Sequence, residues 1–167
     1  MATREEILHA LARVVGAALQ IPDPPIDEPE PSRWTARADV GPAETSVLES
    51  VAVQDDTPES LAFVRGGAEA SEELEFSPVV AFAVQVKPGA GDSTEDLRRI
   101  RRARRDQAVR QIADAIAADP SLGLDLETYA EVRPPARDDD VAFPNALPSA
   151  TALIPVRVLY TGADAAS

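Results

Sequence analysis

The chain has 167 residues, of which 44% are apolar and 27% charged, and this is enough for one hydrophobic core in a single domain spanning residues 1–167. The 16 basic and 29 acidic residues give a formal net charge of −13, which disfavours a role in coating DNA or RNA. The absence of cysteine excludes disulfides, thiolate metal sites and a thiol nucleophile.

No apolar stretch reaches the roughly 20 residues that a membrane-spanning helix needs, and the first residues lack the basic and apolar regions of a signal peptide. We therefore expect a soluble product of the cytoplasm with no membrane anchor.

The first predicted element is a helix that begins after Thr3. Thr3 and Glu6 have the spacing of a capping box, and apolar residues then recur at helical intervals as far as about Gln20. His9, the only histidine, falls on the polar side of this helix.

Residues 21–59 are rich in proline and acidic side chains, which is typical of an extended arm or long loop. Within them, residues 46–54 alternate as one strand does, and we place that strand at a sheet edge. We interpret Trp34 as a hydrophobic anchor that pins the arm to the body of the domain.

Three segments follow before the second helix. Residues 61–64 are predicted as a short strand, and the acidic stretch 69–75 as the turn after it. Residues 79–86 form a strong strand pattern with two largely apolar faces. Such a strand is either central and covered on both sides, or uses its second face for a partner.

The second helix is expected to begin at Ser93 or Thr94 and to end near residue 118, before an Asp-Pro pair. Strands are predicted over residues 126–133 and 151–161, with a polar loop over residues 134–148 between them. Pro155 indicates an edge position or a bulge in the last strand. The order of elements predicts an α+β fold: a single mixed sheet of about four to five strands with two helices packed against it.

Candidate catalytic and metal-binding residues are few. His9 would have to serve any Ser-His-Asp site, but its position on a solvent-facing helix side disfavours that role. Residues 138–140 are consecutive aspartates, which point in different directions and lack the glycine of a calcium loop, so we interpret them as a solvated acidic loop. Neither glycine pair has phosphate-loop spacing. We therefore expect no enzyme, no metal site and no cofactor.

Four arginines of the second helix fall in one sector about 100° wide, and they are called here the arginine ridge: Arg98, Arg101, Arg102 and Arg105. Apolar residues occupy the same sector later in the helix, so we expect the first turns to overhang the domain. Three interpretations remain open for the ridge: a solvated, salt-bridged helix tip, a subunit interface with an acidic surface such as the arm of a neighbour, or contact with DNA phosphates.

Several motifs occur in a particular order: SLAFVRGG, ELEFSPVVAFAVQV, a helix that ends in AIAADPSLGL, LETYAEV and ALIPVRVLYTGADA, preceded by the opening helix REEILHALA. In this order and spacing the chain resembles the small tail terminator proteins of long-tailed, siphovirus-like phages and gene transfer agents, particularly those of high-GC bacterial genomes. The resemblance covers residues 4–19 and about 61–164. Residues 21–59 and the arginine-rich start of the second helix are longer than in that family's pattern.

The resemblance implies a structural virion protein without catalytic residues. Such a protein forms a hexameric ring that caps the finished tail tube, ends its polymerisation and offers a docking surface to the stopper of the head connector. It would be made in the bacterial cytoplasm and end in the neck of the particle, where DNA passes through the ring only as cargo. A heterologous interface between subunits would suit a ridge and an acidic surface on the same chain.

Two other functions stay open on the sequence alone. Another neck or tail-completion protein with a similar small domain would differ mainly in its partner. An acidic DNA mimic that inhibits a nucleic-acid enzyme would use the same net charge, although the arginine ridge and the apolar strands argue against it.

Overall fold

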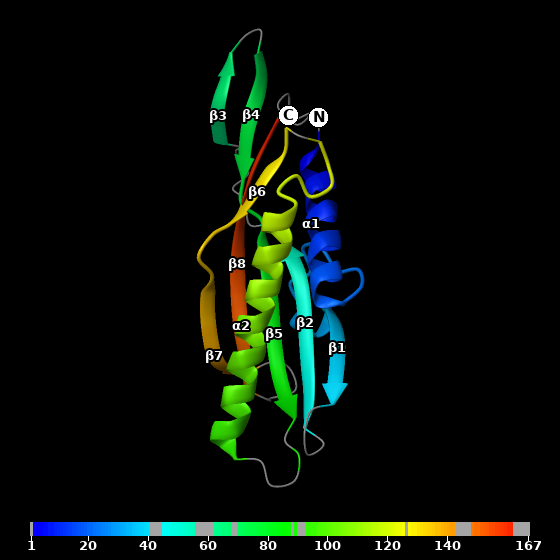
Figure 1. Ribbon diagram of the computed structural model, residues 1–167, viewed down its shortest axis with the longest axis vertical. Coiled ribbons are helices and arrows are strands. Elements are labelled where there is room, and N and C mark those ends of the chain that lie inside the picture. Colours follow the sequence, from blue (N-terminus) through cyan, green and yellow to red (C-terminus); the bar gives the residue numbers. More distant parts are fainter. Residues whose placement is uncertain are drawn as a thin grey trace.

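The structure, a computed structural model, describes residues 2–40, 45–55, 62–67, 70–87, 89, 93–125, 127–142 and 148–161 (Figure 1). It contains two long helices and a short 3-10 helix: α1 (Arg4–Leu19), η1 (Pro31–Arg33) and α2 (Thr94–Ala118). The described residues also form eight strands: β1 (Thr35–Val40), β2 (Ser46–Gln54), β3 (Ala62–Gly67), β4 (Ala70–Phe76), β5 (Val79–Lys87), β6 (Tyr129–Val132), β7 (Ala136–Ala142) and β8 (Pro148–Thr161).

The last strand, β8, organises the sheet because it pairs with four other strands. On one side it pairs first with β5 and then with β4 in one unbroken register, with Val79 opposite Pro155 and Phe76 opposite Val158. On its other side it pairs with β7 and then with β6. β2 lies outside β5, β1 lies outside β2, and β3 lies outside β4.

The α+β class with two helices packed on a sheet is confirmed. The predicted count of four to five strands is only roughly compatible with the eight strands observed, and the sheet is antiparallel rather than mixed. The eight strands occupy only five neighbouring positions in the sheet. Three positions hold two strands end to end: β4 follows the direction of β5, β3 follows that of β2, and β6 follows that of β7. All pairs between these strands are antiparallel, and a parallel bridge joins Ile26 of the arm to Val53.

Pro155 lies where the partner of β8 changes from β6 to β7. Val156 donates its N–H to the carbonyl of Pro78 on the β5 side, so the nitrogen of Pro155 faces the β6–β7 side. That nitrogen has no hydrogen to donate, and the register slips by one residue there, with Val132 opposite Val156 but Ala136 opposite Leu153. The predicted irregularity is thus present, but it lies between β6 and β7, the strands that pair with β8 on this side. The predicted edge position is wrong because β8 is central.

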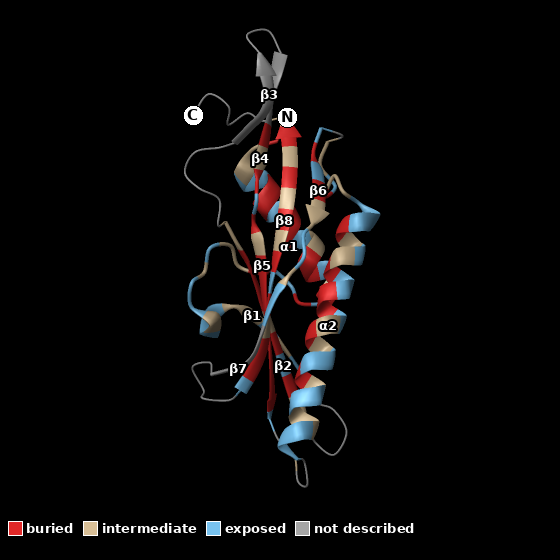
Figure 2. Ribbon diagram, turned by 90° about the vertical axis from the view of Figure 1, so that its left-hand side faces the viewer, coloured by how far each residue is buried: buried red, intermediate tan, exposed pale blue. Residues whose placement is uncertain are grey.

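Both long helices begin and end close to where their caps predict. Thr3 and Glu6 form a complete capping box at the start of α1, and Ser93 accepts a hydrogen bond from the backbone of Asp96 at the start of α2. Gln20 ends α1 in the left-handed conformation. The helices pack on each other and on one face of the sheet, with α2 over β5, β6 and β8 and α1 over β2 (Figure 2).

The core lies between this helical layer and the sheet. The predicted inward face of the last strand is confirmed, because every second residue from Ala152 to Tyr160 is buried. Residues on both faces of β5 are buried from Val80 to Val86 and β5 pairs on both sides, which agrees with the first of the two alternatives, a central strand. Tyr160 and Phe76 meet edge to face with their ring centroids 5.6 Å apart.

Three segments that we predicted as loop or turn are strands. The arm contains β1, and β2 lies between β1 and β5, so its predicted edge position is wrong although its bounds are confirmed. Most of the predicted acidic turn at 69–75 belongs to β4, and the predicted loop at 134–148 contains β7. These polar segments gain their strand structure from pairing with β2 or β8, which their own residue pattern does not reveal. Residues 126–133 contain only the shorter β6.

Candidate subunit interface on helix α2

The first half of α2 carries the arginine ridge, and the structure divides it into a buried and an exposed pair. Arg101 and Arg105 are only 4% and 6% exposed, whereas Arg98 and Arg102 are exposed. We predicted that the first turns of α2 project beyond the domain. This is wrong, because the buried side of the helix extends from Ile112 back to Arg101. Arginine can occupy that line because its aliphatic stem covers apolar surface while its guanidinium group finds polar partners, and both buried arginines have partners.

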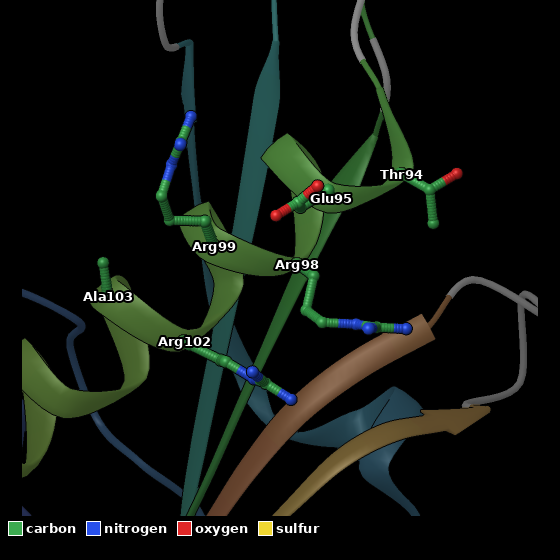
Figure 3. Close-up of a pocket in the computed structure, with 6 residues that line it drawn as sticks. All are labelled: Thr94, Glu95, Arg98, Arg99, Arg102 and Ala103. Carbon is green, nitrogen blue, oxygen red and sulfur yellow. The ribbon is translucent and has the colours of Figure 1, made fainter.

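The exposed pair lies along an open groove on the first turns of α2. Arg98 and Arg102 are one helical turn apart and point to the same side of the helix, whereas Arg99 points away from them (Figure 3). Arg99 instead pairs with Asp96, with 2.6 Å between its terminal nitrogen and the carboxylate oxygen. The groove thus presents two guanidinium groups on one surface.

A buried carboxylate connects α2 to the sheet, and sequence reasoning missed it. Glu49 of β2 is only 5% exposed. One of its oxygens accepts a hydrogen bond of 2.6 Å from Arg104 of α2, and the other accepts one of 2.9 Å from Arg37 of β1. Such charge-assisted bonds satisfy a buried carboxylate. The signal was present in the sequence, because Glu49 is in phase with the buried Val47 and Val51.

A second ionic link ties α2 to β7. Asp106 lies 3.2 Å from Arg105 and 3.6 Å from Arg137, measured between the carboxylate oxygen and the guanidinium Nε. Arg105 of the ridge therefore already meets an acidic group of its own chain, and the other three ridge arginines also have partners.

The first part of the arm, from Pro22 to Trp34, is held to the body by backbone and side-chain hydrogen bonds. Asp27 donates its N–H to the carbonyl of Val53, and Val53 donates in turn to Pro25, each over 2.9 Å. The carbonyl of Glu28 accepts hydrogen bonds of 2.8 Å from the Trp34 indole and from the Gln54 side chain. The Trp34 indole therefore bonds to a residue within the arm, whereas the bonds to Val53 and Gln54 of β2 hold the arm to the sheet.

The arm also packs closely on α1 at Gly16. A Cβ atom at that position would lie 2.7 Å from the carbonyl oxygen of Ile21 and 3.0 Å from the Cδ of Pro24. Only glycine allows this approach. Four carboxylates lie in residues 22–34 and make no ion pair among the described residues: Asp23, Asp27, Glu28 and Glu30. Asp27 and Glu28 instead accept hydrogen bonds from the backbone N–H groups of Asp55 and Glu30.

The sheet face opposite the helices carries both apolar and polar side chains. The exposed Leu153 lies opposite Ala81 of β5, and the exposed Leu48 lies opposite Gln85. On the same face, Arg157 donates hydrogen bonds to Glu75 and Glu131. The hydrogen bonds from Arg157 hold the pKa of Glu75 below its ordinary value, and the same pairing raises the pKa of Arg157.

The candidate catalytic and metal-binding residues remain separate. His9 lies on the exposed side of α1 as predicted, with its Nε2 3.7 Å from a carboxylate oxygen of Glu5. Residues 138–140 belong to β7 rather than to a loop, and their side chains lie outside the described part of the chain.

Within the described residues, no group of three histidine or acidic side chains is placed to hold a metal ion. None of the described helices is long and apolar enough to cross a membrane. No known protein family and no curated protein matches the chain.

Proposed function

We propose that this protein is a tail terminator: a structural virion protein that forms a ring, caps the tail tube, ends its polymerisation and joins it to the stopper of the head connector. The observation that carries the proposal is the ordered set of motifs that resemble this family. Several of the motifs lie next to one another in the sheet. They form β3, β4, β5, β6 and β8, of which β4, β5 and β6 pair with β8 and β3 pairs with β4.

The arrangement of the two layers supports the proposal. Both helices cover one face of the sheet, and the opposite face exposes Leu48 and Leu153. We infer that this opposite face is the one that meets a neighbouring protein.

The charge distribution agrees with a ring through which DNA passes. A formal net charge of −13 repels the phosphate backbone, so a channel lined by such subunits does not retain the DNA. The product is then made in the bacterial cytoplasm and incorporated into the neck of a phage or gene transfer agent, with itself, the tube protein and the stopper as its partners.

The proposal is tested by mixing the purified chain with preformed tail tubes of the same particle. Sedimentation measures binding, and negative-stain imaging locates the bound protein. We expect one ring of about six subunits at one end of each tube, with nothing bound along its length. Binding along the whole tube, or none at saturating concentration, would contradict a terminator and favour another neck or tail-completion protein.

A further inference from the structure

β1 is the outermost strand on one side of the sheet, and its outer edge is unpaired. Among the described strands it pairs with β2 alone, and Figure 1 shows it at the rim of the sheet. In an antiparallel pair, every second residue bonds to the partner strand, and the residues between them point their N–H and C=O groups to the other side. The edge of β1 therefore presents a row of backbone donors and acceptors.

The groups that point outward from β1 belong to Ala36 and Ala38. On β2, Val53 bonds to the arm through its N–H and its carbonyl, and the arm must lie on the β1 side because β5 occupies the other. Val51 is in phase with Val53, so it bonds on the same side, to its partner Thr35. The alternation along β1 then turns the backbone of Ala36 and Ala38 outward. These groups make no hydrogen bond in the part of the chain that the structure describes.

The other edge strands among the described residues carry features that discourage pairing, whereas β1 does not. β3 has two register irregularities, β7 has one together with three consecutive aspartates, and β6 is only four residues long. Bulges, repeated charges and short length all hinder the addition of a further strand. β1 pairs with β2 over six residues without a shift, and its sequence TARADV contains neither proline nor lysine. The edge of β1 is therefore open to another strand.

The sequence of β1 is complementary to itself in one antiparallel register. With Ala38 opposite Ala38 of a second copy, the outward groups of the two strands face each other and Arg37 lies opposite Asp39. The register centred on Arg37 has the same length but puts Arg37 opposite Arg37, and like charges across a strand pair are destabilising. Arg37 donates to Glu49 from one terminal nitrogen and its Nε has no hydrogen-bond partner, so this guanidinium has donors for a second carboxylate.

From these observations we propose that two copies of the chain pair through their β1 strands, antiparallel and centred on Ala38, so that one sheet continues across a two-fold axis. Such a contact uses the same surface on both copies and closes after two subunits. It is therefore separate from the contact that repeats around the proposed ring, and it does not depend on the proposed function. It belongs to the free protein, where it covers the unpaired edge.

Cross-linking tests the pairing and its register, because the chain has no cysteine of its own. Ala36 and Ala38 are both exposed. In the proposed register the two copies of residue 38 lie directly opposite each other, whereas the two copies of residue 36 are four positions, or about 13 Å, apart. A short bifunctional thiol reagent should therefore join two chains of Ala38→Cys at least about tenfold faster than two chains of Ala36→Cys, the matched control.

Analytical ultracentrifugation measures the association itself. Ala38→Pro removes the outward N–H at the centre of the contact but no hydrogen bond to β2, so it should weaken dimerisation at least about tenfold while the chain stays folded. Ala38→Thr keeps that N–H and should dimerise within about threefold of the wild-type chain. A salt concentration of about 150 mM limits the long-range repulsion between two copies, because it screens exposed charges.

A charge variant tests the register independently. Asp39→Arg puts like charges opposite each other in both halves of the contact and should weaken dimerisation, whereas Asp114→Arg makes the same charge change on α2 and should leave it unchanged. Circular dichroism and the unfolding midpoint check that every variant is folded.

Three results would overturn the pairing: a wild-type chain that is monomeric at every concentration, an Ala38→Pro variant that dimerises like the wild type, or equal cross-linking of Ala36→Cys and Ala38→Cys. A monomeric chain that loses tube binding on Ala38→Pro would also overturn it and assign the edge to the tube protein. Failure of the proposed function gives a different result. Dimers that respond to these substitutions, formed by a chain that does not bind tubes, would retain the pairing and reject the terminator.

Discussion

Replacement of Glu49 by alanine tests the ionic connection between α2 and the sheet. The substitution removes two hydrogen bonds, of 2.6 and 2.9 Å, and leaves Arg104 and Arg37 without their shared carboxylate. A hydrogen bond to a charged group contributes about 1.5–3 kcal/mol, and loss of one partner of a buried ion pair costs about 3–5 kcal/mol. The two arginine side chains are 27% and 34% exposed, so water recovers part of this loss. We expect Glu49→Ala to lower the free energy of unfolding by about 2–4 kcal/mol.

Urea denaturation followed by circular dichroism measures this loss as a lower midpoint with an unchanged slope. Glu5→Ala is the matched control, because that side chain is 85% exposed and should cost about 0.5 kcal/mol or less. A double-mutant cycle of Glu49→Ala with Arg104→Ala isolates their coupling. If Glu49→Ala loses no more than the control, the carboxylate does not connect α2 to the sheet.

Three further predictions concern the core, the arm and the charged sheet face. Phe82→Ala should lower the free energy of unfolding by about 3–5 kcal/mol in the same assay, since Phe82 is buried on the helical side of β5; a negligible loss would contradict the assigned faces. Gly16→Ala should destabilise the protein by about 1–3 kcal/mol and speed proteolysis of the arm, although alanine normally favours a helix; a gain in stability would contradict the close contact. The pKa of Glu75 is lower in the folded than in the unfolded state, so its stabilising contribution is complete above the ordinary value of 4.5 and is lost as the pH falls through the lowered folded value. Glu75→Gln should therefore reduce the loss of stability on acidification, and an unchanged pH profile would contradict the pairing with Arg157.

The elements that could be predicted from the sequence are determined by residues that lie close together in the chain. The capping box at Thr3, the serine cap at Ser93 and the helical spacing of apolar residues fix both helices within a few residues. The apolar alternation of β5 and β8 likewise predicts buried strands.

The elements that could not be predicted depend on distant partners. β7 has the sequence ARDDDVA, which has no apolar face of its own, and β1 has the sequence TARADV, whose apolar face is short and consists of Ala36, Ala38 and Val40. Each becomes a strand because β8 or β2 offers free hydrogen-bonding groups beside it.

The same distinction applies to the candidate interface. Helical spacing correctly places the four ridge arginines in one sector, but it cannot tell which of them the sheet covers. Arg101 and Arg105 are buried because the helix lies flat on the sheet, which is a property of the packed domain. Glu49 was open to prediction, since a carboxylate in phase with buried valines requires a cationic partner.

The proposed role in ending tail growth is best tested by the length of tail tubes. Tube protein is polymerised with and without the purified chain, and the length distribution is measured by negative-stain imaging with the chain labelled. If the chain is a terminator, we expect tubes that stop growing when it is added, with a labelled ring at one end of each. Tubes that continue to lengthen at the same rate, with label absent from their ends, would contradict it.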